Sequence, residues 1–199
     1  MLTLYHAPQS RSTRILWLLE EAGADYKVEH VTIPRQDGSG APDVKNPHPD
    51  KKVPYLVHDG EGVVESAAIC LYVGDLYPGA GIAPKPGEKG RGAYVSWLFY
   101  YAGVIEPVIH FAFFGLGDNE NLKRTFRGRA EMDARILAAL KAHDYIAGEA
   151  FSAADILIAS LGQWMRDMLP ADPLVERYLE RCGARPALAR ALAKDAAPA

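Results

Sequence analysis

The chain has 199 residues, 49% of them hydrophobic, which is enough for one or two compact domains with apolar cores. Its 22 basic and 25 acidic residues give a formal net charge of -3, and no long block carries one sign. A dedicated surface for nucleic acids or anionic membranes would cluster Lys and Arg. The composition therefore argues against both kinds of partner.

The two cysteines, Cys70 and Cys182, lie far apart in the sequence. They form no CxxC pair and no Cys/His cluster with zinc spacing, so we expect buried thiols, no disulfide scaffold and no metal site. The N-terminus lacks a leader pattern, and apolar runs such as Ile15–Leu19 are much shorter than a membrane span. A cytoplasmic location is the expectation.

The first segments predict a βαβ unit. Residues 2–7 are typical of a short buried strand, and a helix is predicted from about Ser10 to Gly23. Its apolar residues repeat at i, i+3, i+4 and i+7, as on one helix face: Ile15, Leu18, Leu19 and Ala22. Tyr26–Ile33 is predicted as a second strand. Because crossovers of this kind join parallel strands, the two strands should be parallel.

Residues 34–52 are rich in Pro, Gly, Asp and Lys and predict a long loop, with a short helix near Asp43 as an option. Residues 53–58 and 62–64 then predict a hairpin. A helix follows from Ser66, with apolar residues at helical spacing, and ends at Pro78-Gly79. The order β-α-β, loop, β-β-α predicts a small mixed sheet with helices packed on it.

The second part of the chain shows no strand signals. Residues 78–92 contain five Gly and three Pro, which indicates a connection rather than a regular element. Helical spacing of apolar residues follows, around 97–108, 122–140, 151–164, 174–179 and 186–192. We therefore expect an α/β domain over residues 1–79, a linker at 80–87 and an all-α helical-bundle domain over residues 88–199.

The helix after residue 152 has an explicit start signal. Ser152 is a good N-cap, and Asp155 stands three residues later, as in an acidic variant of the capping box. We predict a hydrogen bond between the Ser152 hydroxyl and the Asp155 amide, and a reciprocal bond to the Asp155 carboxylate. Local capping explains Asp155 fully, so its predicted role is structural.

Four segments in this order resemble the glutathione S-transferase family, in particular its cytosolic, bacterial-like class with a serine or cysteine at the active site. They are Tyr-His-Ala-Pro-Gln-Ser-Arg-Ser-Thr-Arg at 5–14, Lys-Val-Pro-Tyr-Leu at 52–56, Val-Glu-Ser-Ala-Ala-Ile at 64–69 and Gly-Glu-Ala-Phe-Ser-Ala-Ala-Asp-Ile at 148–156. The resemblance spans about residues 2–165 and implies a thioredoxin-like first domain. The loop at 46–52 departs from the family's commoner Asn-Pro-x-Gly-Lys form.

The resemblance implies that glutathione is the co-substrate and reacts as its thiolate. An unperturbed thiol has a pKa of about 8.5, so a protein must stabilise the anion to ionise it at neutral pH. The amides and dipole at a helix N-terminus, together with a hydroxyl, supply that stabilisation. Ser10 matches the family's serine or cysteine, and Ser12 is the alternative donor. Plain helix capping is the competing interpretation for Ser10, and Tyr5, within the strand, is a weaker candidate.

Other site residues follow from the same resemblance. Val53-Pro54 matches the family's cis-proline, which presents the Val53 backbone to the cysteinyl part of glutathione. Glu65 and Ser66 match the residues that receive the γ-glutamyl group, with helix capping by Ser66 as the competing interpretation. Lys52, or His48 in the same loop, is a candidate for the glycyl carboxylate. Arg14 matches an arginine with a mainly structural role.

The family binds a small hydrophobic electrophile between its domains and forms homodimers. An aromatic segment provides candidates for that pocket, although most such residues belong to a core: Trp97, Tyr100, Tyr101, Ile105, His110, Phe111, Phe113 and Phe114. The expected function is conjugation of glutathione to the electrophile, or a related glutathione-dependent reaction. A non-catalytic binding or regulatory protein of the same fold is the alternative. A dithiol oxidoreductase is disfavoured because no CxxC stands at the helix start.

Overall fold

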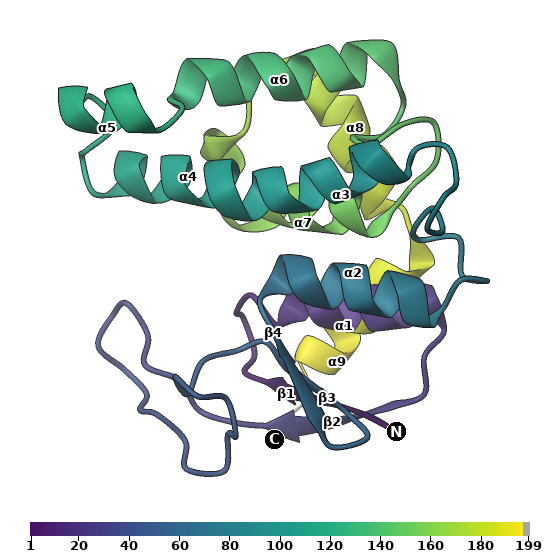
Figure 1. Cartoon of the computed structure of the whole chain (residues 1–199). Coiled ribbons are helices and arrows are strands. Elements are labelled where there is room, and N and C mark those ends of the chain that lie inside the picture. Colours follow the sequence, from purple (N-terminus) through teal and green to yellow (C-terminus); the bar gives the residue numbers. More distant parts are fainter. Residues whose placement is uncertain (197–199) are drawn as a thin grey trace. The chain divides into compact units, whose positions relative to one another are not determined.

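The computed structural model describes residues 1–196 and contains two compact units (Figure 1). The first unit combines residues 1–80 with the segment that begins at Arg185, and the second comprises residues 81–184. Residues 197–199, which the sequence analysis assigned to the helical domain, lie outside the described residues. The connection rich in Gly and Pro includes the boundary between the two units.

The first unit is built on a mixed four-stranded sheet in the order β2-β1-β3-β4. Strands β1 and β2 are parallel, and the other neighbours are antiparallel, as the β-α-β and hairpin patterns predict. The strands are β1 (Leu2–His6), β2 (Tyr26–His30), β3 (Tyr55–His58) and β4 (Glu61–Val64). The long segment between β2 and β3 contains turns and no helix near Asp43.

Helix α1 (Thr13–Ala22) lies beside α2 (Ser66–Leu76) against the sheet (Figure 1). Every residue of α1 from Thr13 to Leu19 is buried, which explains its long apolar face. The helix starts three residues later than predicted, because residues 10–12 form a turn that is closed by the Thr13 amide on the Ser10 carbonyl at 3.1 Å. Gly23 ends the helix in the left-handed conformation at φ 61°, which suits glycine.

Helix α9 (Pro186–Asp195) corrects the expected domain assignment, because it belongs to the first unit and packs against α1. Arg185 holds the Glu21 carboxylate with two hydrogen bonds of 2.6 and 2.8 Å. Arg190 and Lys194 both bind Glu20, at 2.7 and 2.5 Å. Pairing between charges so far apart in the sequence cannot be recognised from helical periodicity, which explains the wrong assignment.

The second unit is helical throughout its regular elements. One continuous helical stretch joins α3 (Arg91–Tyr100), the π-helical turn η1 (Tyr101–Ile105) and α4 (Glu106–Phe113). The remaining elements are α5 (Glu120–Thr125), α6 (Arg129–Ala142), α7 (Ala153–Trp164), the 3-10 turn η2 (Arg166–Met168) and α8 (Pro173–Gly183). The single helical pattern predicted over 122–140 is therefore two helices, α5 and α6.

The stretch Arg91–Phe113 has 23 residues and is long and apolar enough to meet the length and composition of a membrane-spanning helix. The apolar runs singled out in the sequence are much shorter, so this stretch was not predicted as a candidate span. Buried helices in the cores of soluble proteins have the same length and composition. Tyr94, Leu98, Tyr101 and Ile105 of this stretch are buried inside the second unit.

Half of the capping box predicted at the start of α7 is present: the Asp155 amide donates to the Ser152 carbonyl at 2.9 Å, and not to the Ser152 hydroxyl as predicted. The Ser152 amide donates to Asp155 Oδ2 at 2.8 Å, as predicted for the reciprocal bond, and the Ser152 hydroxyl also donates to that oxygen at 3.1 Å. Asp155 accepts two further bonds that its neighbours in sequence do not predict, from the Ile146 amide at 2.8 Å and the Tyr178 hydroxyl at 3.1 Å. Asp155 therefore links three segments of the second unit.

Candidate functional site

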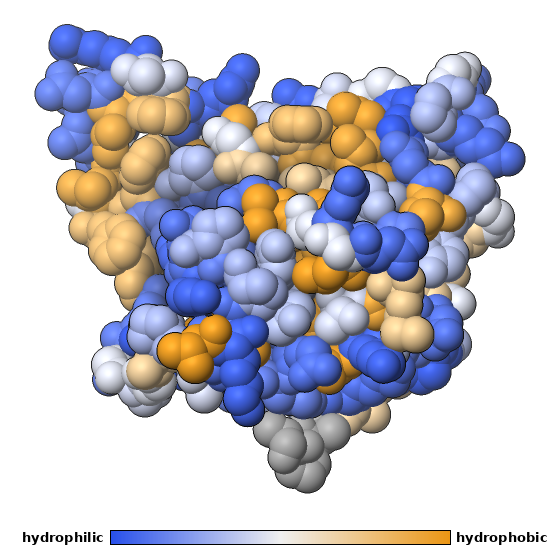
Figure 2. All heavy atoms as spheres, turned by 60° about the horizontal axis from the view of Figure 1, so that its bottom comes forward, coloured by the Kyte–Doolittle hydropathy of each residue, from blue (hydrophilic) through white to orange (hydrophobic). Residues whose placement is uncertain are grey.

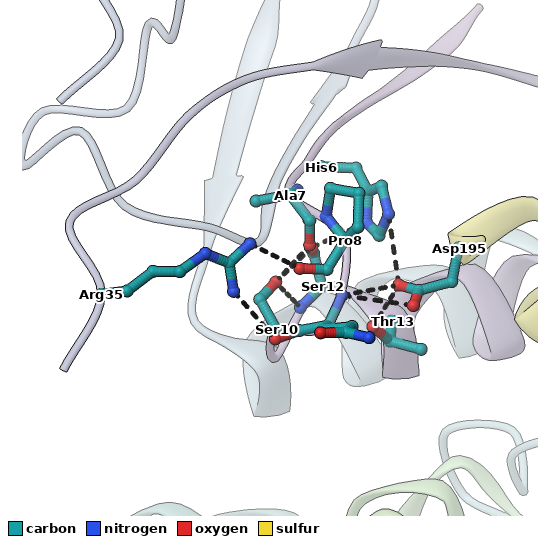
Figure 3. Close-up of polar contacts among 9 residues, drawn as sticks. His6, Ala7, Pro8, Ser10, Ser12, Thr13, Arg35 and Asp195 are labelled. Atoms are coloured by element: carbon teal, nitrogen blue, oxygen red, sulfur yellow. Dashed lines mark hydrogen bonds and ion pairs between the residues drawn. The ribbon is translucent and has the colours of Figure 1, made fainter. Parts of the chain in front are cut away.

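The turn that precedes α1 holds the Ser10 hydroxyl through polar contacts (Figure 3), and Ser10 lines a cavity. The hydroxyl donates to the Ala7 carbonyl at 2.7 Å, and its oxygen accepts the Ser12 amide at 3.1 Å. Ser10 is half-buried, so this oxygen is held by the backbone while one side of the residue faces the cavity. If the hydroxyl turns its single proton away from the Ala7 carbonyl, it can donate to an anion beside the start of the helix.

Ser12, the alternative donor, is completely buried. Its oxygen lies 2.8 Å from Nδ1 of His6 and accepts the Ala7 amide at 3.2 Å. Ser12 is also the N-cap residue of α1, although its hydroxyl makes no capping bond to the helix. The two serines predicted as donors are thus in contact, with 2.7 Å between their oxygens, and Ser10 is the one beside the cavity.

The cavity has a volume of about 730 Å³ and brings three predicted binding residues together: Ser10, Lys52 and Val53. Its other lining residues come from the turn before α1 and from the loop after β2, and they include Arg11, Arg35, Asp37 and Asp50. The guanidinium of Arg35 donates to the carbonyls of Pro8 and Gln9, at 2.8 and 3.3 Å, and so ties that loop to the turn (Figure 3). The cavity offers both signs of charge to a zwitterionic ligand.

Asn46 organises the loop that carries Lys52. Its side chain is fully buried, donates to the Lys52 carbonyl at 2.9 Å and accepts the His48 amide at 3.0 Å. His48, the alternative to Lys52, is buried, packs its ring against Tyr55 and accepts the Asp50 amide on Nδ1 at 3.0 Å. Lys52 is exposed and lines the cavity. The geometry favours Lys52 over His48 as a ligand-binding residue.

Asn46→Ala should therefore loosen this loop and leave the His48 amide without its partner. We expect a loss of about 1–3 kcal/mol in the free energy of unfolding, the usual effect of removing a buried hydrogen-bond partner. Chemical denaturation measures this loss. The exposed loop residue Asp50 gives the matched control, Asp50→Ala, which should cost less than about 0.5 kcal/mol. Equal stability of the two variants would contradict the role given to Asn46.

The Val53–Pro54 peptide bond is cis, as predicted. Val53 lines the cavity, whereas Pro54, Glu65 and Ser66 are not among its lining residues. Glu65 is exposed and has a left-handed backbone at φ 68°, which a residue other than glycine rarely adopts. Glu65 itself is the N-cap of α2 and Ser66 the first helical residue, so the competing interpretation of Ser66 as the N-cap is wrong.

Two models of known protein domains match the chain. That of the glutathione S-transferase N-terminal domain matches residues 1–75, and that of the C-terminal domain matches residues 104–186. The chain belongs to the glutathione S-transferase family. The resemblance that the sequence analysis drew from four short segments is thereby confirmed, and so is the combination of a thioredoxin-like domain with a helical one.

Individual relatives align over nearly the whole chain. Glutathione S-transferase 3 of Schizosaccharomyces pombe is 29% identical over 94% of this chain and 85% of its own length. The disulfide-bond oxidoreductase YfcG of Escherichia coli is 28% identical over 98% of this chain and 95% of its own. A sphingomonad glutathione S-transferase solved in complex with glutathione is 27% identical, with a TM-score of 0.75 over 98% of this chain and 100% of that chain.

Behind the serines of this glutathione S-transferase lies a buried pair that the sequence analysis missed, His6 and Asp195 (Figure 3). Nε2 of His6 lies 3.3 Å from Oδ1 of Asp195. Asp195 also accepts the Gln9 amide at 3.2 Å and the Thr13 hydroxyl at 2.5 Å. His6 stands in the first motif, but Asp195 comes from α9 and carries no local signal. Only the packing of α9 on α1 brings the two together.

Burial lowers the pKa of His6 to about 4; the Asp195 carboxylate raises it less than burial lowers it, and the neighbouring His30 lowers it further. His6 is therefore neutral at pH 7.

Burial raises the pKa of the Cys70 thiol to about 12, against a smaller opposing effect of Arg14. Both cysteines are buried, as expected, so Cys70 stays protonated and out of reach of substrates.

The aromatic segment of the second unit divides into core and surface. Trp97, Tyr100, Tyr101 and Ile105 are buried, and Nδ1 of His110 bonds to the Glu106 carbonyl at 2.7 Å, which is a structural contact within the helix. Phe113 and Phe114 are exposed to 53% and 64%. Figure 2 shows apolar side chains gathered at the upper left, over the α4–α5 end of this unit. Of the residues predicted for the electrophile pocket, these two phenylalanines are the exposed ones.

Proposed function

We propose that this glutathione S-transferase binds glutathione in the cavity beside α1 and uses its thiolate to attack a small hydrophobic electrophile. The observation that carries the proposal is the Ser10 hydroxyl, held at the start of α1 and at the edge of a cavity that Lys52 and Val53 also line. The reaction forms a sulfur–carbon bond and releases a leaving group, or adds the thiol across a double bond.

Only a modest free energy is needed to ionise the bound glutathione thiol at neutral pH. Lowering a thiol pKa from about 8.5 to about 6.5 takes about 2.7 kcal/mol of preferential stabilisation of the anion. A hydrogen bond to a charged group contributes about 1.5–3 kcal/mol. The positive end of the α1 dipole adds about 0.3–1 kcal/mol. One hydroxyl and one helix N-terminus therefore suffice, and no cysteine of the protein is needed.

The remaining parts of the tripeptide can be assigned to predicted residues. The ammonium of Lys52 suits the glycyl carboxylate, because it is exposed and lines the cavity. The Val53 backbone suits the cysteinyl peptide group. The α-carboxylate of the γ-glutamyl group suits Ser66 at the start of α2, with the Glu65 carboxylate on its ammonium. The strained backbone of Glu65 supports a role in ligand binding there, since such strain is concentrated at functional sites.

For the electrophile we propose the exposed aromatic side chains of α4 and the turn that follows it, Phe113 and Phe114. A homodimer and a cytoplasmic location complete the proposal, and both follow from the resemblance to the cytosolic family. Light scattering should report twice the chain mass of 21.7 kDa. A species of 21.7 kDa alone would contradict the dimer.

Reduction of disulfides by glutathione is a second candidate, because the relative YfcG, which aligns over 98% of this chain, is named a disulfide-bond oxidoreductase. Two molecules of glutathione would reduce one disulfide, giving glutathione disulfide and two thiols. The buried cysteines of this chain cannot take part, so the electrons would come from glutathione alone. Cys70→Ser should then keep full activity, whereas its complete inactivation would indicate a protein-based dithiol reaction.

Two assays on the purified protein test these proposals. The first assay measures glutathione binding by calorimetry. The second measures turnover of glutathione with chlorodinitrobenzene and, in a separate reaction, with hydroxyethyl disulfide. Conjugation of the aromatic chloride supports the transferase proposal, and turnover of the disulfide alone supports the second candidate. Tight binding without either reaction would identify a non-catalytic binding protein instead.

A further inference from the structure

A short basic segment stands next to the exposed aromatic side chains of the second unit. Residues 123–129 read Lys-Arg-Thr-Phe-Arg-Gly-Arg and include no acidic residue, whereas the whole chain has a net charge of -3. The segment runs from α5 through the connection that follows it to the first residue of α6. None of the residues proposed to hold glutathione belongs to it.

This basic segment forms one side of a small groove against α4. Val108, Phe111 and Leu116 line the groove from α4 and the turn after it, and Phe126 and Arg127 line it from the segment. The rings of Phe111 and Phe126 are in contact, with their centroids 5.4 Å apart. The volume of the groove is about 40 Å³, so it admits the edge of a ligand but not a whole aromatic ring.

Apolar surface continues outside the groove. Phe113 and Phe114 are exposed, and their ring centroids lie 5.4 Å apart. Leu116 and Phe126, which line the groove, are exposed as well. In Figure 2, hydrophilic side chains border the apolar ones over the α4–α5 end of the unit. We call these four exposed side chains the apolar patch. It is large enough to support a flat ring whose edge enters the groove.

Acidic partners already balance two of the basic side chains that line the groove. Lys123 lies 3.2 Å from Asp118 and 3.5 Å from Glu120. Nε of Arg129 lies 2.7 Å from Asp133, and its guanidinium also donates to two backbone carbonyls. These two side chains therefore have little charge left to offer to a ligand.

Arg127 lines the groove with its charge unbalanced. It is exposed, and within residues 1–196 its guanidinium has no hydrogen bond or ion pair. A guanidinium is always charged and presents paired N–H groups that match the two oxygens of a carboxylate. An apolar groove and patch beside such a group are complementary to a ligand that combines an aromatic ring with a carboxylate.

We propose that the electrophile of this transferase is an aromatic anion, whose ring lies on the apolar patch and whose carboxylate binds the guanidinium of Arg127. The inference rests on the proposed function, in which the electrophile contacts Phe113 and Phe114, and it adds the chemical class of that electrophile. Arg127 is thus a specificity-determining residue, because it binds a part of the substrate that does not react. A neutral ring makes the same apolar contacts without the charged one.

Two aryl chlorides that differ in charge test the inference. 4-Chloro-3,5-dinitrobenzoate has a carboxylate, and 1-chloro-2,4-dinitrobenzene has none. In both, the glutathione sulfur bonds to the ring carbon that bears the chlorine, and chloride leaves with the electron pair of the broken bond. Arg127→Gln should lower kcat/KM about fivefold for the benzoate and less than about twofold for the neutral chloride. Each value is compared with that of the unmodified enzyme for the same substrate, so the different reactivities of the two chlorides cancel.

Arg124→Gln is the matched control. It makes the same chemical change three residues earlier, at an exposed arginine that is not among the residues lining the groove. It should change kcat/KM less than about twofold for either chloride. Equal losses for both chlorides in Arg127→Gln would show a general disturbance of the site and overturn the inference. No loss for the benzoate, or the same selective loss in Arg124→Gln, would also overturn it.

A binding measurement separates this inference from the proposed function. 3,5-Dinitrobenzoate lacks the chlorine and cannot be conjugated, and calorimetry with saturating S-methylglutathione measures its Kd while the cavity beside α1 is filled. The Kd should rise about fivefold in Arg127→Gln. If the unmodified enzyme conjugated neither chloride, the proposed function would fail, and binding that depends on Arg127 would still support the anion site. If both chlorides reacted and Arg127→Gln changed neither kcat/KM nor the Kd, only this inference would fail.

Discussion

Replacing Ser10 with alanine should lower kcat/KM for conjugation by about 10–100-fold at pH 6.5. The substitution removes the hydroxyl that donates to the thiolate, and a hydrogen bond to a charged group contributes about 1.5–3 kcal/mol. That energy corresponds to a rise of about one to two units in the pKa of the bound thiol. The loss of activity should diminish as the pH approaches 9, because more of the thiol ionises without help. Initial rates measured from pH 6 to 9 test both statements.

A matched control for Ser10→Ala is Ser160→Ala, the same chemical change at a buried serine in α7, whose hydroxyl donates to the Leu157 carbonyl at 2.9 Å. Its activity profile should follow that of the unmodified enzyme. A Ser10→Ala enzyme with an unchanged profile would mean that the turn before α1 ionises glutathione through its amides alone.

Replacing Asp155 with alanine should have the largest effect on stability. Asp155 accepts from the amides of Ile146 and Ser152 and from the hydroxyl of Tyr178, all in the buried interior of the second unit. Removing the carboxylate leaves these donors without a partner, at a cost of about 1–3 kcal/mol each. We expect a loss of about 3 kcal/mol or more in the free energy of unfolding by chemical denaturation. Asp172→Ala, which removes a single N-cap bond from α8, should cost only about 1 kcal/mol.

The contribution of Asp155 to the free energy of unfolding should grow as the pH falls. Burial raises the pKa of Asp155 from 3.8 to about 6, against the smaller opposing effects of its hydrogen bonds. Between these two values the folded protein binds the proton more tightly than the unfolded chain. Stability contributed by this group therefore increases as the pH falls from 7 to 4. The gap between the unmodified protein and Asp155→Ala should widen over that range, and a narrowing gap would contradict the raised pKa.

Local patterns predicted the elements of the first unit well. The spacing of apolar residues identifies α1 and α2, and the order of strand signals predicts the mixed sheet. The start of α1 was placed too early because Ser10 and Ser12 are both good capping residues, and periodicity cannot choose between them. The reciprocal capping bond of Asp155 was predicted, whereas its bonds to Ile146 and Tyr178 were not, because they depend on how α7 packs.

Sequence motifs predict only some of the residues of the candidate site. Ser10, Lys52 and Val53 stand in recognisable motifs, and the structure brings them to one cavity. Asp195 has no motif, since an aspartate at the end of a short helix is usually exposed. Its importance arises because α9 packs against α1, an arrangement that depends on pairs such as Arg185 with Glu21. Long-range charge pairing of this kind leaves no periodic trace in the sequence.

Titration of glutathione bound to the unmodified enzyme tests the central claim most directly. The thiolate absorbs in the ultraviolet where the thiol does not, so a difference spectrum recorded from pH 5 to 10 gives the pKa of the bound sulfur. We predict a value at least about one unit below that of glutathione in solution. A bound thiol that titrates together with the dissolved tripeptide would show that the start of α1 does not stabilise the anion.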